Sequence, residues 1–173
     1  MAWYSIFAPD VVAKSYKEIT VEQLLAMNCR LLAIDIDNTL VPYYQAKPDI
    51  EVIEFFRNME KFGIEVILLS NNTKQRVDTF AQDLNTKAYS LSKKPLPKVY
   101  KQMINDTNIK SEHIVCVGDQ LLTDVLGAHL AKLRIIWCQP LVKAELIITR
   151  FNRILEHFIY RILLKKGLLD EKM

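Results

Sequence analysis

The chain has 173 residues, half of them hydrophobic and a quarter charged, which is ordinary for a globular domain. A formal net charge of +3 is too small to indicate nucleic-acid binding, although it would favour anionic substrates or surfaces. No apolar run is long enough to span a membrane and no secretory signal pattern is visible, so we expect a cytoplasmic protein. The three cysteines lack Cys-x-x-Cys spacing, and Cys116 and Cys138, which lie inside apolar runs, indicate buried thiols.

Residues 1–30 are expected to form an N-terminal preamble that packs on the core. Its aromatic residues Trp3, Tyr4 and Phe7 could pack against the domain or insert at a membrane interface, where Trp and Tyr are favoured. Asp10 is a candidate cap for a short helix, and the segment that starts at Thr20 has the form of a capping box.

The next stretch is an apolar run that ends in two aspartates, and it predicts a buried parallel strand over residues 31–34. Asp35 would lie at the carboxyl end of that strand, where open α/β sheets place their ligands. If the extended geometry continues, Asp35 and Asp37 share a face and need a cation between them, and Mg²⁺ suits such oxygen ligands. The alternative is a strand end followed by a solvated Asp-Asn turn.

Strands and helices then alternate. Asp49 opens a helix that ends near Phe62 and is closed by Gly63, and Asn72 or Thr73 caps a second helix. Further strands are predicted over residues 65–69, 88–90, 114–117 and 134–138, and further helices over residues 95–106, 121–131 and 142–166. This alternation predicts a Rossmann-like α/β fold with a parallel sheet flanked by helices in three layers. A catalytic core over residues 31–140 and a C-terminal amphipathic helix over residues 141–173 complete the expected organisation.

Several polar residues follow the predicted strands and would meet at one edge of the sheet. They are Asp35, Asp37, Ser70, Asn71, Lys94 and Asp119. Carboxylates there can hold Mg²⁺, while hydroxyl, amide and ammonium groups can hold phosphate, and an aspartate can act as a phosphoryl-transfer nucleophile. Taken singly, Ser70 could only start a helix, Lys94 could be solvated, Asp119 could belong to a turn, and Asp124 could complement a helix dipole.

Four motifs of this chain resemble those of the haloacid dehalogenase (HAD) superfamily of phosphohydrolases. They are Asp35-Ile-Asp37-Asn-Thr39-Leu, Ser70-Asn71-Asn72, Lys94-Pro95 and Gly118-Asp119-Gln-Leu-Leu-Thr-Asp124. The last string, the Ser-Asn-Asn turn and the Thr149-Arg-Phe-Asn-Arg153 segment resemble the YqeG-type subclass IIIA phosphatases more closely. The likeness spans about residues 4–155.

The resemblance implies a role for each matching residue. Asp35 would be the nucleophile and would ligate Mg²⁺, and Asp37 would be the general acid/base and lend its backbone carbonyl to the metal. Ser70 and the Asn71 amide would hold phosphate oxygens. Lys94 would neutralise the phosphate, and Asp119 would bind Mg²⁺ directly. Thr39 and Asp124 would support the site, with Asp124 either near the metal or orienting Lys94.

The chain departs from the family pattern after the last motif. Gly127-Ala128-His129 stands where relatives usually have Gly-Gly-Asn, and Lys132 replaces an expected glycine. His129 could touch the site or could be a tolerated helix residue.

The intervals between the motifs are too short for an inserted cap domain, so we expect an open pocket. Capless HAD members tend to act on large or surface-bound substrates, and relatives of this type include phosphatidylglycerophosphate phosphatases. The resemblance therefore implies Mg²⁺-dependent hydrolysis of phosphatidylglycerophosphate through an aspartyl-phosphate. The alternatives are a phosphatase for a soluble or macromolecular phosphate and a non-catalytic partner-binding module.

The C-terminal helix combines apolar and basic residues at helical spacing. It could lie peripherally on an anionic membrane, on the inner face, pack on the core, or pair with another subunit. We expect packing up to about Phe158 and leave the helix beyond it open. The sequence does not determine the oligomeric state.

Overall fold

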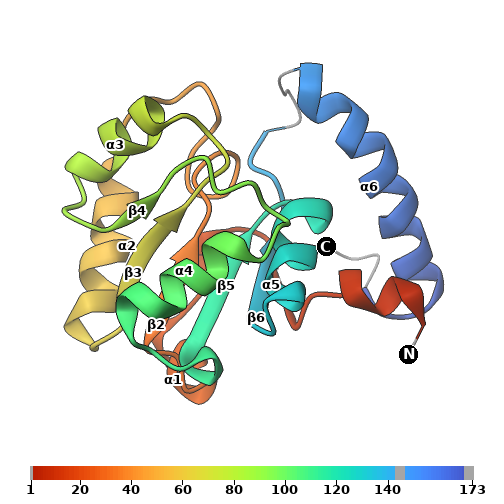
Figure 1. Ribbon diagram of the computed structural model, residues 1–173, viewed down its shortest axis with the longest axis horizontal. Coiled ribbons are helices and arrows are strands. Elements are labelled where there is room, and N and C mark those ends of the chain that lie inside the picture. Colours follow the sequence, from red (N-terminus) through yellow and green to blue (C-terminus); the bar gives the residue numbers. More distant parts are fainter. Residues whose placement is uncertain (1, 143–146, 170–173) are drawn as a thin grey trace.

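The computed structural model describes residues 2–142 and 147–169, and of residues 147–153 only the backbone. Six parallel strands form one sheet in the order β1-β6-β5-β2-β3-β4 (Figure 1). The strands are β1 (Val11–Ala13), β2 (Leu31–Ile34), β3 (Glu65–Leu69), β4 (Ala88–Tyr89), β5 (Ile114–Gly118) and β6 (Arg134–Cys138). The predicted parallel α/β fold class is confirmed.

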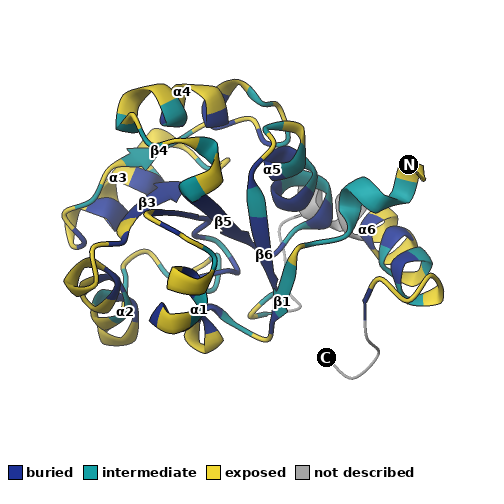
Figure 2. Ribbon diagram, turned by 90° about the horizontal axis from the view of Figure 1, so that it is seen from below, coloured by how far each residue is buried: buried dark blue, intermediate teal, exposed yellow. Residues whose placement is uncertain are grey.

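The helices cover both faces of this sheet (Figure 2). They are α1 (Val21–Ala26), α2 (Ile50–Lys61), α3 (Lys74–Gln82), α4 (Lys98–Thr107), α5 (Leu126–Leu130) and α6 (Ile147–Lys165). Short 3₁₀ turns lie at η1 (Trp3–Phe7), η2 (Tyr16–Glu18) and η3 (Ser111–His113), and a π-helical turn lies at η4 (Leu121–Val125). The predicted helix over residues 121–131 is therefore a π turn followed by α5.

The central strand β2 is buried on both sides because its side chains alternate between two apolar layers. Leu32 and Ile34 face the layer made with α1, α2 and α3, whereas Leu31 and Ala33 face the layer made with α4, α5 and α6. All of β2 is buried, so a continuous apolar run was the correct signal for this strand.

Local sequence signals account for most helix boundaries. Asp49 caps α2 by accepting a hydrogen bond from the Val52 amide, and Thr73 caps α3 in the same way. Gly63 follows α2 with a φ of +75°, a conformation that glycine adopts without strain. These predictions are confirmed.

The N-terminal segment differs from the prediction at Asp10 and in containing the strand β1. Asp10 does not cap a helix, because β1 begins directly after it and adds a strand to the sheet edge beside β6. The Asp10 carboxylate accepts a hydrogen bond from the Ile135 amide at 2.8 Å, so Asp10 stabilises the attachment of β1 to β6. Tyr4 and Phe7 pack on the core, and Trp3 remains 63% exposed.

The C-terminal helix α6 lies at the edge of the molecule alongside the N-terminal segment (Figure 1). Ile159 and Leu163 are buried against the core, whereas Phe158 is 58% exposed. The part of the helix beyond Phe158, which the sequence left open, packs on the core through one face, and the expectation of packing up to about Phe158 stays a prediction for the residues whose side chains are not described. No helix among the described residues is both long and apolar enough to cross a membrane.

Candidate active site

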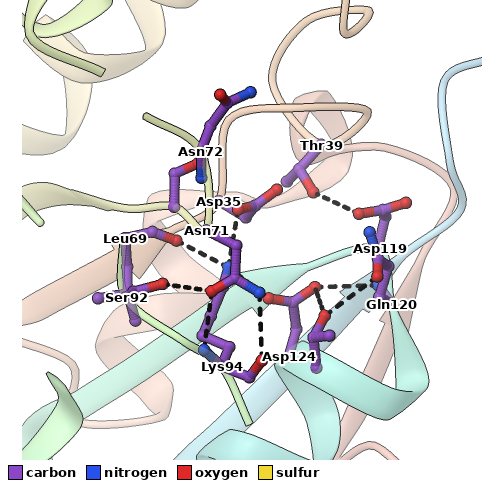
Figure 3. Close-up of polar contacts among 12 residues, drawn as sticks. Asp35, Thr39, Leu69, Asn71, Asn72, Ser92, Lys94, Asp119, Gln120 and Asp124 are labelled. Atoms are coloured by element: carbon purple, nitrogen blue, oxygen red, sulfur yellow. Dashed lines mark hydrogen bonds and ion pairs between the residues drawn. The ribbon is translucent and has the colours of Figure 1, made fainter. Parts of the chain in front are cut away.

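The carboxyl ends of β2, β3 and β5 meet at one edge of the sheet, and the polar residues that follow these strands gather there (Figure 3). Asp35 continues directly from β2, and its amide donates a hydrogen bond to Val117 O of β5 at 2.9 Å. Ser70 follows β3 and Asp119 follows β5. Asp35, Ser70 and Asp119 are all buried. The parallel topology thus brings together residues that are far apart in the sequence.

Lys94 is the cation at the centre of the site. Its ammonium contacts Asp35 Oδ1 at 2.7 Å, Asp124 Oδ1 at 2.6 Å and the Leu69 carbonyl oxygen at 2.7 Å (Figure 3). The Lys94 side chain is only 3% exposed, so three acceptors replace the water that this ammonium loses. Asp124 was expected either near the metal or beside Lys94, and in the structure its carboxylate contacts the Lys94 ammonium.

Burial and charge act in opposite directions on this cluster. Burial tends to lower the pKa of Lys94, but the carboxylates of Asp124 and Asp35 outweigh it and the net shift is upward. Burial also raises the pKa of Asp35, an effect that Lys94 opposes and that the neighbouring Asp124 and Asp37 reinforce. A further cation at this edge would therefore stabilise the ionised form of Asp35.

The extended geometry of β2 ends at Ile34, before Asp37, and the Asp37 carboxylate is bound by other side chains. Its Oδ1 accepts a hydrogen bond from Arg76 Nη2 at 3.0 Å, and its Oδ2 accepts one from Asn72 Nδ2 at 3.0 Å. Arg76 also donates to the carbonyl oxygens of Gln45 and Ala46. Both oxygens of Asp37 are thus held, one by Asn72 in the β3–α3 connection and the other by Arg76 in the first turn of α3.

The Asn71 side chain organises the loop that carries Lys94. Its Oδ1 accepts hydrogen bonds from Ser92 Oγ at 2.8 Å and from the Lys94 amide at 2.7 Å, and its Nδ2 donates to the Lys94 carbonyl oxygen at 3.1 Å (Figure 3). Ser70 Oγ accepts a hydrogen bond from the Asn72 amide at 3.1 Å. The loops after β3 and β4 are therefore fixed to each other.

The loop after β5 is held just as closely. Asp124 Oδ2 accepts hydrogen bonds from the Gln120 amide at 3.0 Å and from Thr123 Oγ1 at 3.3 Å. Trp137 Nε1 donates to the Asp119 carbonyl oxygen at 2.7 Å, and Thr39 Oγ1 lies 3.4 Å from Asp119 Oδ1. Thr39 thus connects the β2 loop to the β5 loop (Figure 3).

A glycine is required where β5 ends. A Cβ atom on Gly118 would lie 2.3 Å from Cγ of Asp124, inside any acceptable contact distance. The absence of a side chain at Gly118 is therefore what lets Asp124 fold back toward Lys94.

The residues that depart from the family pattern lie away from this cluster. His129 Nδ1 lies 2.7 Å from the Ile6 carbonyl oxygen and Nε2 lies 3.4 Å from Asp10 Oδ2, so His129 tethers the N-terminal segment. Lys132 has a φ of +59°, the left-handed conformation that a glycine would adopt without strain.

The donor set fits a divalent cation that is only partly enclosed by protein. Within residues 2–142 and 147–169, no group of three or more Asp, Glu, His or Cys side chains converges as a complete metal cluster. Mg²⁺ commonly uses one or two carboxylates and completes its shell with waters and substrate phosphate. Asp35 and Asp119 offer such carboxylates. The site also contains two further aspartates, Asp37 and Asp124, which form ion pairs with Arg76 and Lys94.

Sequence reasoning missed three side chains that shape this site. Arg76 lies in α3, where an arginine usually indicates a solvated helix face. Trp137 lies in β6, where a tryptophan usually indicates core packing. Glu156, on α6, accepts a hydrogen bond from the Leu122 amide at 3.1 Å. The available sequence signal for it was an acidic residue at helical spacing from the apolar residues Ile159 and Leu163.

Comparisons with known proteins agree with this architecture. A family model described as HAD-hydrolase-like matches residues 92–139. Probable phosphatase YqeG of Bacillus subtilis (strain 168) is 36% identical over 161 residues, covering 93% of this chain and 94% of the relative. A glyceraldehyde 3-phosphate phosphatase of Pyrococcus furiosus is 27% identical over 116 residues, covering 63% of this chain and 48% of that protein.

Solved structures share the fold. A putative 3-deoxy-D-manno-octulosonate 8-phosphate phosphatase from Vibrio cholerae has a TM-score of 0.56 at 18% identity, covering 85% of this chain and 91% of that one. The cobalt-bound deoxy-D-mannose-octulosonate 8-phosphate phosphatase of Haemophilus influenzae has a TM-score of 0.54 at 14% identity, covering 83% and 94%. The fold is thus that of HAD phosphatases. With the sequence relative, it follows that this chain belongs to the YqeG-type, subclass IIIA family of HAD phosphatases.

Proposed function

We propose that this HAD phosphatase hydrolyses phosphomonoesters through an aspartyl-phosphate on Asp35, with Mg²⁺ as its cofactor. The observation that carries the proposal is the Lys94 ammonium, which lies between the carboxylates of Asp35 and Asp124 at 2.7 and 2.6 Å. A nucleophilic carboxylate that attacks an anionic phosphoryl group needs a fixed cation beside it. HAD phosphatases generally use Mg²⁺, and Asp35, Asp119 and the Asp37 carbonyl are the groups proposed to hold it.

The reaction follows in two displacements. An Asp35 oxygen attacks phosphorus, the ester P–O bond breaks, and the Asp37 carboxyl donates a proton to the departing oxygen. A water then attacks phosphorus, gives its proton to Asp37, and the bond between Asp35 and phosphorus breaks. Mg²⁺, when bound, would offset the charge of the phosphoryl oxygens and orient them for in-line transfer. Ser70 and the Asn71 amide are proposed to bind those oxygens, and Lys94 to neutralise them.

Phosphatidylglycerophosphate is the substrate that we propose. Between Asp35 and Lys94 the chain holds only α2, β3, α3, β4 and their connections, so no cap domain covers the site. A phosphate that projects from a bilayer could therefore reach it without being enclosed.

The outer face of α6 supports a membrane-bound substrate. It exposes three apolar side chains followed by two basic ones, Ile154, Leu155, Phe158, Arg161 and Lys165. Apolar burial and charge attraction would act together on an anionic bilayer, which would place the enzyme peripherally on its inner face.

The experiment is phosphate release with Mg²⁺ from phosphatidylglycerophosphate in mixed micelles, beside its soluble counterpart glycerol 3-phosphate. We expect kcat/KM to be higher for the lipid. Turnover of the soluble ester alone would retain the chemistry and reject the lipid substrate. Absence of turnover on a broad panel of phosphomonoesters would favour a non-catalytic partner-binding module.

A further inference from the structure

A buried carboxylate lies on the inner face of α6, where packing alone would select an apolar side chain. Glu156 is 5% exposed, and its neighbours on the same helix face, Ile159 and Leu163, are 3% and 0% exposed. A carboxylate in such a place is costly unless it accepts hydrogen bonds. Glu156 Oε1 accepts one from the Leu122 amide at 3.1 Å. Its burial is therefore tied to one particular segment of the core.

That segment is the π-helical turn η4. The first amides of a helical turn have no partner within the turn and need an acceptor from elsewhere. Gln120, which precedes η4, provides no side-chain cap. Glu156 satisfies the Leu122 amide from a helix 34 residues further along the chain. It thus caps η4 from outside, with a carboxyl oxygen as the acceptor for the Leu122 amide.

The capped turn joins two residues of the candidate site. Asp119 lies just before η4 and Asp124 lies within it, with its carboxylate on Lys94 at 2.6 Å. Trp137 fixes the Asp119 carbonyl oxygen at 2.7 Å. Glu156 adds a contact to the same loop at Leu122, so the segment from Asp119 to Asp124 is fixed from the sheet and from α6.

We infer that Glu156 is a positioning residue for the metal site. By fixing the start of η4 it sets the position of the Asp119 carboxylate relative to Asp35, and hence the affinity for Mg²⁺. The inference rests on the proposed function, in which those two carboxylates hold Mg²⁺. With this role for Glu156, the inner face of α6 supports the active site. The outer face of α6, with its exposed apolar residues, remains a surface element.

The test compares Glu156→Leu with Glu156→Gln. Leucine fits an apolar interior but accepts no hydrogen bond, whereas glutamine keeps an acceptor oxygen at the same reach. Mg²⁺ binding is followed without substrate by the Mg²⁺-dependent rise in Tm, and with substrate by the Mg²⁺ concentration for half-maximal phosphate release. Glu156→Leu should weaken Mg²⁺ binding by about 10-fold, the lower end of the loss when a direct partner of a metal ligand is removed, because Glu156 contacts the loop of Asp119 and not Asp119 itself. Glu156→Gln should weaken it much less.

A core variant separates positioning from general stability. Ile64→Val shortens a side chain that is 1% exposed just before β3, far along the chain from η4, and should lower Tm without changing the Mg²⁺ requirement. If Glu156→Leu does not fold, Glu156→Asp takes its place, since it withdraws the carboxylate from Leu122 by one methylene and should give an intermediate loss.

The outcomes are distinguishable. A Glu156→Leu or Glu156→Asp protein that binds Mg²⁺ as the wild type does would overturn the inference and leave the proposed function standing. A wild-type protein whose Tm and phosphate release do not respond to Mg²⁺ would overturn the proposed function, and this inference with it.

Discussion

The Arg76 guanidinium holds Asp37 in place. Arg76 Nη2 donates to Asp37 Oδ1 at 3.0 Å, and the two side chains are 14% and 21% exposed. The same guanidinium donates to the carbonyl oxygens of Gln45 at 2.6 Å and Ala46 at 2.8 Å. Arg76 therefore fixes the proposed general acid/base to Gln45 and Ala46, which lie later in the same β2–α2 connection.

Replacement of Arg76 by alanine should damage proton transfer more than phosphoryl binding. General acid catalysis matters most for a poor leaving group, so kcat/KM should fall about 10²-fold or more for glycerol 3-phosphate and much less for p-nitrophenyl phosphate. Arg76→Lys keeps the charge without the planar fork and should recover part of the loss. Equal losses on both esters would indicate a purely structural role for Arg76.

Replacement of Lys94 by methionine should reduce stability as well as activity. It leaves the buried carboxylates of Asp35 and Asp124 together without their cation, which should cost about 3–5 kcal/mol in the free energy of unfolding. Urea unfolding measures this cost. Lys93→Met, at the exposed neighbouring position, should change stability by about 0.5 kcal/mol or less. A Lys94→Met protein as stable as the wild type would contradict the ion-pair cluster.

Replacement of Gly118 by alanine should disable the site through Asp124. The new methyl group would lie where the Asp124 carboxyl group is, so that carboxylate must leave Lys94. We expect a loss of about 1–3 kcal/mol in stability together with loss of phosphate release. Gly63→Ala is the matched control, because its strained φ of +75° should also lower stability but it lies at the end of α2. Full activity in Gly118→Ala would refute the steric argument.

Removal of the metal should lower thermal stability. A ligand that binds only the folded state stabilises it by about 2.7 kcal/mol at one hundred times its Kd, so Mg²⁺ should raise Tm and EDTA should reverse the rise. Asp119→Asn removes a charged ligand and should abolish most of the effect. An identical Mg²⁺-dependent rise in Asp119→Asn would exclude Asp119 as a metal ligand.

The outer face of α6 should bind anionic vesicles. Phe158→Ser removes an apolar side chain that is 58% exposed, and should reduce co-sedimentation with phosphatidylglycerol vesicles while leaving hydrolysis of a soluble ester unchanged. Leu25→Ser, at a half-exposed position on α1, is the control and should bind as the wild type does. Equal binding by the two variants would place the membrane contact elsewhere.

The central strands could be predicted because burial on both faces leaves a continuous apolar run. Leu31 to Ile34 is such a run, and the parallel fold then places Asp35, Ser70 and Asp119 at one edge. The edge strand β1 has only three residues and partial burial, so its pairing with β6 is determined by tertiary contacts that no local pattern records.

The interactions within the site depend on which side chains reach across elements. Arg76 follows a helix cap and reads as a solvated residue, yet its guanidinium reaches Asp37, 39 residues earlier in the chain. Glu156 reads as one charge in a basic amphipathic helix, yet the rotation of α6 places it on the inner face. The roles assigned to Asp35, Asp37, Ser70 and the other motif residues remain predictions.

Trapping the covalent intermediate is the most direct test of Asp35 as the nucleophile. The enzyme is mixed with substrate and Mg²⁺, quenched in acid, and reduced with borohydride, which converts an aspartyl-phosphate to homoserine. We predict homoserine at position 35, identified by peptide mass spectrometry, and none in Asp35→Asn, which should also release no phosphate. Phosphate release by Asp35→Asn at the wild-type rate, or homoserine at another aspartate, would contradict the mechanism.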